Sequence, residues 1–252
     1  MARVVSLYPL VLLAAVWEVV ARTGLTPPIF LPAFSHVVAD LFTQLLAGQF
    51  FGPMLVSLYR AFAGFAIAMV IGVTTGIAMA QFTWLNRFMT PIISTGFPAP
   101  KIALLPIFIL WFGIDHMSKI LLVAFVCVFP FIVAAYGAAS TVPRAQIWAA
   151  QAMATTRAGM IFRVVLPASL PSLLSGVRVA IPQALVSAFT AEMIAGGGGL
   201  GGELVYAQRF FETTTVFEIL ILMLAIGYVI DTLFLKLRIH TLRWHEQTAS
   251  KD

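Results

Sequence analysis

Long apolar segments alternate with short polar segments along this chain. Each apolar segment has about 20 residues, the length with which an α-helix crosses the hydrocarbon core of a bilayer. The segments lack the residue-by-residue alternation of a transmembrane β-barrel. The pattern predicts an all-α membrane protein in which residues 1–252 form a single transmembrane domain. We place its six transmembrane helices at about 4–21, 55–79, 89–112, 119–138, 172–195 and 217–237.

Prolines interrupt the third predicted helix at positions 91, 98, 100 and 106. Because proline removes a backbone donor and crowds the preceding turn, this helix is expected to be kinked or partly unwound. Irregular backbone at membrane depth is tolerated only beside protein or a water-filled cavity. The residues that we assign to a translocation pathway are Pro98, Pro100, Lys101, Arg178 and Glu192. For Lys101 a second interpretation stays open, in which its side chain reaches the membrane surface.

The polar segment 144–167, between the fourth and fifth predicted helices, carries three arginines and no carboxylate. Its residues Trp148, Ala149, Ala152 and Met153 fall on one face of a helix. A connection between two membrane helices needs only a few residues, so a helical segment of this length predicts a further role. We interpret it as a docking surface for a partner on the cytoplasmic side.

Positive charges are distributed unevenly between the two sides of the membrane. The side that holds both termini receives nine basic residues, which are Arg3, Arg87, Arg144, Arg157, Arg163, Lys236, Arg238, Arg243 and Lys251. The opposite side receives four, which are Arg22, Arg60, Lys119 and Arg209. Because cytoplasmic loops carry the excess of lysine and arginine, both termini and segment 144–167 are expected in the cytoplasm.

The composition agrees with a membrane protein and argues against most other classes. Hydrophobic residues make up 61% of the chain, charged residues 10%, and the mean hydropathy is +0.99. The net charge of +5 comes from arginines beside the predicted helices, which argues against nucleic-acid binding. The single cysteine, Cys127, excludes a disulfide or a thiolate metal site within one chain. Since no nucleophile–base or metal-ligand cluster is recognisable, we expect no catalytic residue and no metal site.

Two glycine motifs bear on nucleotide binding. The sequence contains no GxxxxGK[ST], so the chain is not expected to bind ATP by a P-loop of its own. The glycine run 196–202 contains a formal GxGxxG at Gly197, Gly199 and Gly202. A dinucleotide-binding motif must follow a strand, whereas this one follows a predicted membrane helix. We interpret the run as a flexible extracytoplasmic loop that lets a gate move.

Segment 144–167 resembles the cytoplasmic signature of the permease subunits of bacterial ATP-binding-cassette importers. That signature reads EAA, three residues, G, nine residues, I, one residue, LP, and the corresponding positions here are Trp148, Ala149, Ala150, Ala154, Val164, Leu166 and Pro167. Trp148 takes the place of the family's glutamate and Ala154 that of its glycine. Segments 97–113 and 118–120, and 191–193 with the glycine run that follows, are similar to the nitrate, sulfonate and taurine branch. The resemblance covers nearly the whole chain.

The resemblance implies a type I importer permease fold in the bacterial inner membrane, with short coupling helices between helices four and five. It implies that the seven positions contact a separate cytoplasmic ATPase that binds the ATP, so this chain is not an enzyme and holds no cofactor. The other implied partners are a second permease copy, an extracytoplasmic solute-binding protein and membrane lipid.

Three details of segment 144–167 follow from the same register. Without the glutamate, docking at Trp148 would rest on aromatic burial. Ala154 in place of glycine favours continuation of the helix. Leu166 and Pro167 are expected to end the second short helix and redirect the chain into the fifth span.

These features predict a permease subunit that forms the path for a small anionic solute, such as nitrate, a sulfonate or taurine. We expect it to be coupled to the ATPase by alternating access. The main alternative is a secondary carrier that works without an ATPase, which would need intramembrane coupling acids and an inverted repeat. Neither feature is evident, and an intramembrane enzyme is a third, weaker alternative. The sequence leaves the identity of the solute and the choice between homodimer and heterodimer open.

Overall fold

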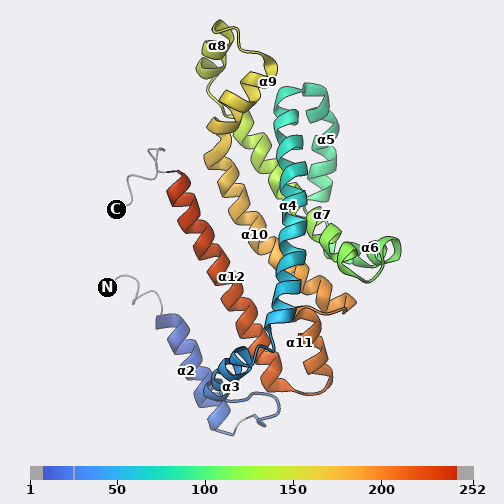
Figure 1. Ribbon diagram of the computed structural model, residues 1–252, viewed down its shortest axis with the longest axis vertical. Coiled ribbons are helices and arrows are strands. Elements are labelled where there is room, and N and C mark those ends of the chain that lie inside the picture. The colour runs from blue at the N-terminus through green and yellow to red at the C-terminus, as the bar shows by residue number, and fades with distance from the viewer. Residues whose placement is uncertain (1–7, 25, 243–252) are drawn as a thin grey trace. The chain divides into compact units, whose positions relative to one another are not determined.

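The computed structural model describes residues 8–24 and 26–242, in which every regular element is a helix (Figure 1). The predicted all-α class is confirmed. The elements are α2 (Tyr8–Arg22), α3 (Phe34–Leu46), α4 (Phe51–Gln81), α5 (Thr83–Gly96), the 3-10 helix η1 (Lys101–Leu104), α6 (Leu105–Phe112), α7 (His116–Ser140), α8 (Arg144–Ala152), α9 (Arg157–Met160), the π-helix η2 (Ile161–Val165), α10 (Leu166–Ala195), α11 (Leu200–Arg209) and α12 (Thr213–Thr241).

Four described helices are long and apolar enough to cross a membrane: α4, α7, the continuous helix Arg163–Ala195 and α12. They correspond to the second, fourth, fifth and sixth predicted spans. The first predicted span, 4–21, is helical over its described part, the 15 residues of α2. Its residues 4–7 lie outside the described part of the chain.

The third predicted span is a broken helix. The helical segments Thr83–Gly96 and Lys101–Phe112 are bent by 95° relative to each other. Taken together, they are long and apolar enough to form one membrane span. The break falls at residues 97–100, where two of the prolines stand, while Pro91 lies inside α5. The kinked or partly unwound helix predicted from the prolines is confirmed.

The chain divides into two compact units, which we describe separately. The first unit comprises Met1–Ser57 and Glu192–Ile226, and the second comprises Leu58–Ala191 and Gly227–Asp252. In the first unit the indole of Trp17 on α2 contacts the rings of Phe34 on α3 and Phe217 on α12, at centroid distances of 5.2 and 4.9 Å. In the same unit α3 buries Val37 and Leu41.

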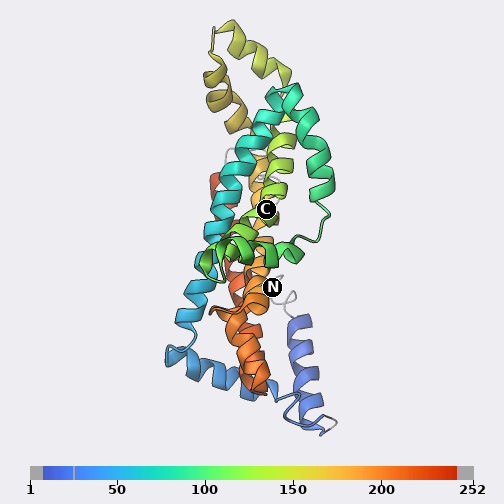
Figure 2. The ribbon, with the colours of Figure 1, turned by 90° about the vertical axis from the view of Figure 1, so that its right-hand side faces the viewer.

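The second unit is built around α7, the long helix with the largest buried share. Glycines on α4 let the two backbones approach closely. A Cβ on Gly64 would lie 2.6 Å from the carbonyl oxygen of Ile120, and one on Gly76 would lie 2.6 Å from the Cβ of Ala135. The segment containing α8 and α9 continues beyond the end of α7, as Figures 1 and 2 both show.

Candidate functional site

The segment between α7 and α10 holds the predicted coupling positions. Its first helix, α8, ends in a left-handed turn at Ala154, whose φ is +53°. The Ala154 N–H donates to the carbonyl of Gln151 at 2.9 Å, and the Thr155 N–H donates to the carbonyl of Ala150 at 3.2 Å. These two bonds form a Schellman motif, in which the left-handed position is usually glycine. The expectation that Ala154 favours helix continuation is therefore wrong, because the chain turns at this residue.

The second short helix passes into α10 without a break. Thr156 caps α9, since its Oγ1 accepts a hydrogen bond from the Gly159 N–H at 3.2 Å. The π-helix η2 follows, and Leu166 has helical φ and ψ of −63° and −48°. The expectation that Leu166 and Pro167 end a helix is wrong, because both lie in the first turn of α10. The wider hydrogen-bonding pattern of the π-turn accommodates a proline that cannot donate to the carbonyl four residues earlier.

An open hollow lies between α8 and the η2–α10 junction, with a cavity volume of about 480 Å³. We call it the α8–α10 hollow. Its lining residues are Gln146, Ala149, Ala150, Met153, Arg163, Val164, Pro167 and Ala168. The short alanine side chains of α8 leave this space unfilled, and Met153 beside it is 80% exposed. The hollow is therefore an apolar surface with one guanidinium at its border.

The hollow brings together four of the seven predicted coupling positions, namely Ala149, Ala150, Val164 and Pro167. Trp148 is 63% exposed and Ala154 forms the turn, and neither lines the hollow. Leu166 packs against a buried cluster that includes Val165, Ala138 and Leu173. Leu166 thus contacts the interior of the second unit.

The predicted pathway residues Pro98, Pro100 and Lys101 lie at the break in the third span. The Lys101 Nζ donates to the carbonyl of Phe97 at 2.6 Å. It also lies 5.4 Å from the ring centroid of Phe97 and 5.1 Å from that of Phe129. The ammonium group therefore contacts the carbonyl and ring of Phe97 at the bend and the ring of Phe129 on α7. These contacts stabilise the bend.

Arg178 on α10 faces an acid that the sequence interpretation overlooked. Its Nε lies 3.5 Å from Oδ1 of Asp231 on α12, and both side chains are close to half exposed. Arg238, also on α12, donates to the Ser175 Oγ at 3.2 Å. Two polar contacts thus join α10 to α12 in the second unit. No local signal links Arg178 with Asp231, because 53 positions separate them.

Two cations counted on the side opposite the termini, Arg60 and Lys119, are buried side chains of helices. Arg60 is 1% exposed and its Nε donates to Nδ1 of His116 at 3.2 Å. Lys119 is fully buried and its Nζ donates to the carbonyl of Ile114 at 2.6 Å. Both residues belong to the predicted spans 55–79 and 119–138, and the structure adds that neither side chain is exposed to solvent.

Glu192, the last predicted pathway residue, is fully buried in the first unit. Its Oε2 accepts hydrogen bonds from the Ser57 hydroxyl at 2.7 Å and from the Gly201 N–H at 3.1 Å. The Ser57 Oγ in turn accepts from the Leu200 N–H at 2.8 Å. The carboxylate and the hydroxyl therefore satisfy two N–H groups in the first turn of α11, where a helix leaves its donors without internal partners.

The loop 196–199 connects α10 with α11, and we call it the glycine loop. Its four glycines have φ between +67° and +86°, a region that other residues avoid. A Cβ on Gly199 would collide with the carboxylate of Glu192. The positive φ angles require glycine at these positions, and close packing on Glu192 requires it at Gly199 as well. The mobility expected from the sequence stays a prediction.

Comparison with solved structures gives the fold class. One subunit in the structure entitled "Inward facing conformations of the MetNI methionine ABC transporter" matches with a TM-score of 0.64 at 20% sequence identity, over 73% of this chain and 92% of that one. A chain of an amino acid ABC transporter matches with a TM-score of 0.61 at 18% identity, over 81% and 97% of the two chains. The architecture is that of a type I importer permease.

Comparison of the sequence gives the family. Residues 68–237 match the family described as "Binding-protein-dependent transport system inner membrane component", and the chain belongs to this family. A taurine transport system permease protein from Escherichia coli is 30% identical over 95% of this chain and 89% of its own length. A putative aliphatic sulfonates transport permease protein from Bacillus subtilis is 29% identical over 94% and 86%. The chain is thus an integral membrane permease subunit of an ATP-binding-cassette importer, and not an enzyme.

Proposed function

We propose that this chain forms the translocation path for a small solute with an anionic group of the sulfonate class, such as taurine, and is driven by ATP bound and hydrolysed on separate subunits. The α8–α10 hollow is the observation that carries the coupling part of the proposal. The names of relatives similar over nearly the whole chain support the solute class. Nitrate belongs to the same group of small anions and stays within the proposal.

The ATPase would dock at the α8–α10 hollow. An apolar depression that is rimmed by exposed side chains fits an inserted helix or loop of a partner. Trp148 on α8 and Met153, the residue just after α8, would be covered by the partner, and burying a large exposed side chain is the usual source of affinity at such surfaces. Ala149, Ala150, Val164 and Pro167 would shape the floor, with Ala154 and Leu166 holding the segment in position.

Movement of the docked segment would be transmitted through α10. Because η2 continues into α10 without a break, a displacement at the hollow acts directly on the fifth span. The same helix carries Arg178, which pairs with Asp231 of α12 in the second unit. Closure of two ATPases would thereby change the arrangement of the spans and give alternating access.

The translocation path would involve the broken third span, with Pro98, Pro100 and Lys101, and the charged residues Arg178 and Glu192. Both cations have neighbours that could exchange for an anion: a carbonyl for Lys101 and a carboxylate for Arg178. A passing anion would compete with these partners. Such weak, replaceable contacts suit a path that must release its solute.

The assembly would contain a second permease copy, two ATPases, a solute-binding protein and surrounding lipid. The excess of basic residues beside segment 144–167 supports a cytoplasmic location for this segment and both termini. The glycine loop then faces the extracytoplasmic side, where the solute-binding protein delivers solute. Exposed apolar residues along α2, such as Leu10, Val11 and Leu13, would contact lipid or the second copy.

Reconstitution tests this function. The purified chain would be placed in vesicles with its ATPase and its solute-binding protein, and uptake of radiolabelled taurine would be followed. We expect uptake only with internal ATP and the complete assembly. Uptake by the chain alone under a proton or sodium gradient would contradict the proposal and support the secondary carrier.

A further inference from the structure

The bent third span exposes an apolar face in the second unit. Its second half, α6, has an inner face that packs on α7, where Leu105 is fully buried and the ring of Phe108 lies 6.1 Å from that of Phe125. The opposite side of α6 is apolar and exposed to solvent. The exposed residues are Ile107, Leu110 and Trp111 of α6, followed by Ile114 and Met117 at the corner where α7 begins. We call these five residues the α6 outer face.

The area of the α6 outer face is sufficient for a specific protein interface. Its side chains are between 41% and 82% exposed. Taking about 200 Å² for each fully exposed side chain, the face offers roughly 600 Å² on one copy of the chain and about 1,200 Å² on two. Specific protein–protein interfaces begin at about this total, and an exposed apolar patch of this size usually marks an interaction site.

The break that precedes α6 lies near the middle of the membrane. The Lys101 Nζ is 5.1 Å from the ring centroid of Phe129, and a Cβ on Gly96 would lie 2.5 Å from the Cε1 of the same ring. Phe129 is the 14th of the 25 residues of α7, a helix that is long and apolar enough to span the bilayer. The break is therefore about as far from one end of α7 as from the other.

The backbone at this depth lacks part of its helical hydrogen bonding. Pro98 and Pro100 have no N–H, so the carbonyls four residues earlier have no helical donor. These carbonyls belong to Ser94 and Gly96 at the end of α5. Lipid supplies no donor, and irregular backbone at membrane depth therefore occurs only beside protein or a water-filled space. The charge of Lys101 makes contact with lipid unfavourable as well.

Lipid and water are thus each excluded from one part of the bent span. Lipid does not cover the break, and water does not cover the apolar α6 outer face. A protein neighbour that packs on the outer face and leaves a water-filled space at the break meets both conditions. In the proposed assembly the ATPases and the solute-binding protein bind at the membrane surfaces, so a second copy is the neighbour available at this depth.

We infer that the α6 outer face packs against the same face of a second copy of this chain, and that the break opens onto the space between the two copies. The inference rests on the proposed function, which includes the second copy, and adds the surface through which the copies meet. A two-fold symmetric pair brings identical surfaces together. Ile107 and Ile114 of one copy then lie close to their counterparts in the other.

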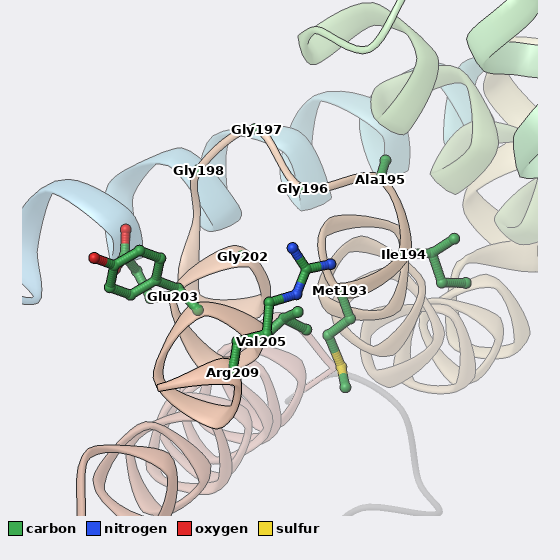
Figure 3. A pocket seen from close by; sticks show the side chains of 11 residues that line it. Met193, Ile194, Ala195, Gly196, Gly197, Gly198, Gly202, Glu203, Val205 and Arg209 are labelled. Carbon is green, nitrogen blue, oxygen red and sulfur yellow. The ribbon is translucent and has the colours of Figure 1, made fainter. Parts of the chain in front are cut away.

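Cysteine cross-linking between copies tests this surface. The variants are Ile107→Cys and Ile114→Cys on the outer face, with Ile194→Cys as the control, and the native Cys127 is buried. Ile194 is 58% exposed, against 57% for Ile114 and 41% for Ile107, so the control is not less accessible. It lies at the end of α10 in the first unit, and its side chain extends away from the glycine loop (Figure 3). A short bis-maleimide is applied to vesicles with the complete assembly, and the dimer fraction is measured on a denaturing gel.

We expect at least about tenfold more cross-linked dimer from Ile107→Cys and Ile114→Cys than from Ile194→Cys, because thiols held side by side react faster than thiols that meet by collision. Equal amounts from all three variants would overturn the inference. Thiols at positions 107 and 114 that stay uncross-linked would overturn it too, and a second reagent would identify what covers them. Reaction with membrane-soluble pyrene maleimide would indicate lipid, and reaction with a charged methanethiosulfonate would indicate water.

This outcome is separable from that of the proposed function. ATP-dependent taurine uptake is measured for each variant before the reagent is added, which shows whether the assembly is intact. Uptake without cross-linked dimers would overturn the interface alone. If the wild-type assembly transported no taurine, the cross-linking would be repeated on the purified full-length chain in vesicles. Dimers from Ile107→Cys and Ile114→Cys, but not from Ile194→Cys, would support the interface there, and their absence would overturn it.

Discussion

The segments that precede and follow α10 in the chain are stabilised by different means. Before α10, the α8–η2 segment is held by backbone turns, small apolar contacts and a strained alanine, and Trp148 and Met153 are left exposed. After α10, the glycine loop is held by a buried carboxylate and a buried hydroxyl that satisfy the start of α11. The first segment thus leaves large apolar side chains exposed, whereas buried groups of the chain itself satisfy the second.

Under the proposed function, the α8–η2 segment gains its final stability from another protein, so that the partner's movement changes it. The glycine loop keeps its shape without a partner, because buried groups of the chain itself satisfy its donors. We therefore expect the segment with exposed apolar side chains to respond to a partner, and the segment whose polar groups are hydrogen-bonded within the chain to stay fixed.

The largest expected effect concerns the buried carboxylate of the glycine loop. Glu192→Ala removes the acceptor for the Ser57 hydroxyl and the Gly201 N–H, and buried donors without partners are costly. We expect the free energy of unfolding in detergent to fall by about 3 kcal/mol. The exposed Glu212→Ala variant should change it by less than about 0.5 kcal/mol. Equal stability of the Glu192 variant and the wild type would show that the network does not hold the loop.

The next effect concerns the incomplete segment. Met153→Asp places a charge at the border of the α8–α10 hollow, where the partner would have to desolvate it. We expect affinity for the ATPase to fall roughly thirtyfold, equivalent to about 2 kcal/mol, with unchanged stability of the isolated chain. Gln151→Asp introduces the same charge on the same helix outside the hollow lining. Equal loss for both variants would place the docking surface elsewhere.

A smaller change in the free energy of unfolding is expected at Glu218, which like Glu192 is a fully buried acid of the first unit. Glu192 has hydrogen-bond donors, whereas neither carboxylate oxygen of Glu218 accepts a hydrogen bond from a described group, and its neighbour is the carboxyl of Asp40. Glu218→Gln supplies an amide that can donate to Asp40 and cannot become a second negative charge beside it. We expect the unfolding free energy to rise by about 1 kcal/mol. A decrease in an equilibrium unfolding titration would mean that Glu218 has a favourable role as an acid.

The smallest effect concerns the turn after α8. Ala154→Gly relieves a left-handed alanine and should stabilise the isolated chain by about 1 kcal/mol. Ala152→Gly, at the last helical position of α8, should instead destabilise it by up to about 1 kcal/mol. Thermal unfolding midpoints of the two variants would therefore move in opposite directions. A shift in the same direction would contradict the Schellman assignment.

Hydrophobic length and proline positions were sufficient to predict the long helices and the broken third span. Both features depend only on residues close together in the sequence, namely the length of an apolar run and the backbone N–H groups that prolines lack. The resemblance to the importer signature selected Ala149, Ala150, Val164 and Pro167, which line the α8–α10 hollow, and their contact with an ATPase stays a prediction. Local patterns did not predict the left-handed turn at Ala154, since an intrinsic preference for helix is overruled there by the need to end α8.

The remaining errors have a tertiary origin. Continuity through Leu166 and Pro167 depends on the π-turn before them, which no sequence pattern announces. The pairing of Arg178 with Asp231 and the burial of Arg60 and Lys119 depend on how helices distant in sequence pack together. A count of basic residues on the two sides of the membrane does not distinguish buried cations from exposed ones, so it included both.

Site-directed cross-linking tests the central claim, that the α8–α10 hollow receives the ATPase. The single native cysteine, Cys127, is buried, so a cysteine placed at Met153 would be the main reactive thiol of the folded chain. A heterobifunctional reagent would be applied to the complete assembly, with Leu110→Cys as a control of equal exposure, since Leu110 is 82% exposed. The account predicts a cross-link from Met153→Cys to the ATPase and none from Leu110→Cys. A Met153→Cys thiol that stays freely reactive and uncross-linked in the assembled transporter would contradict it.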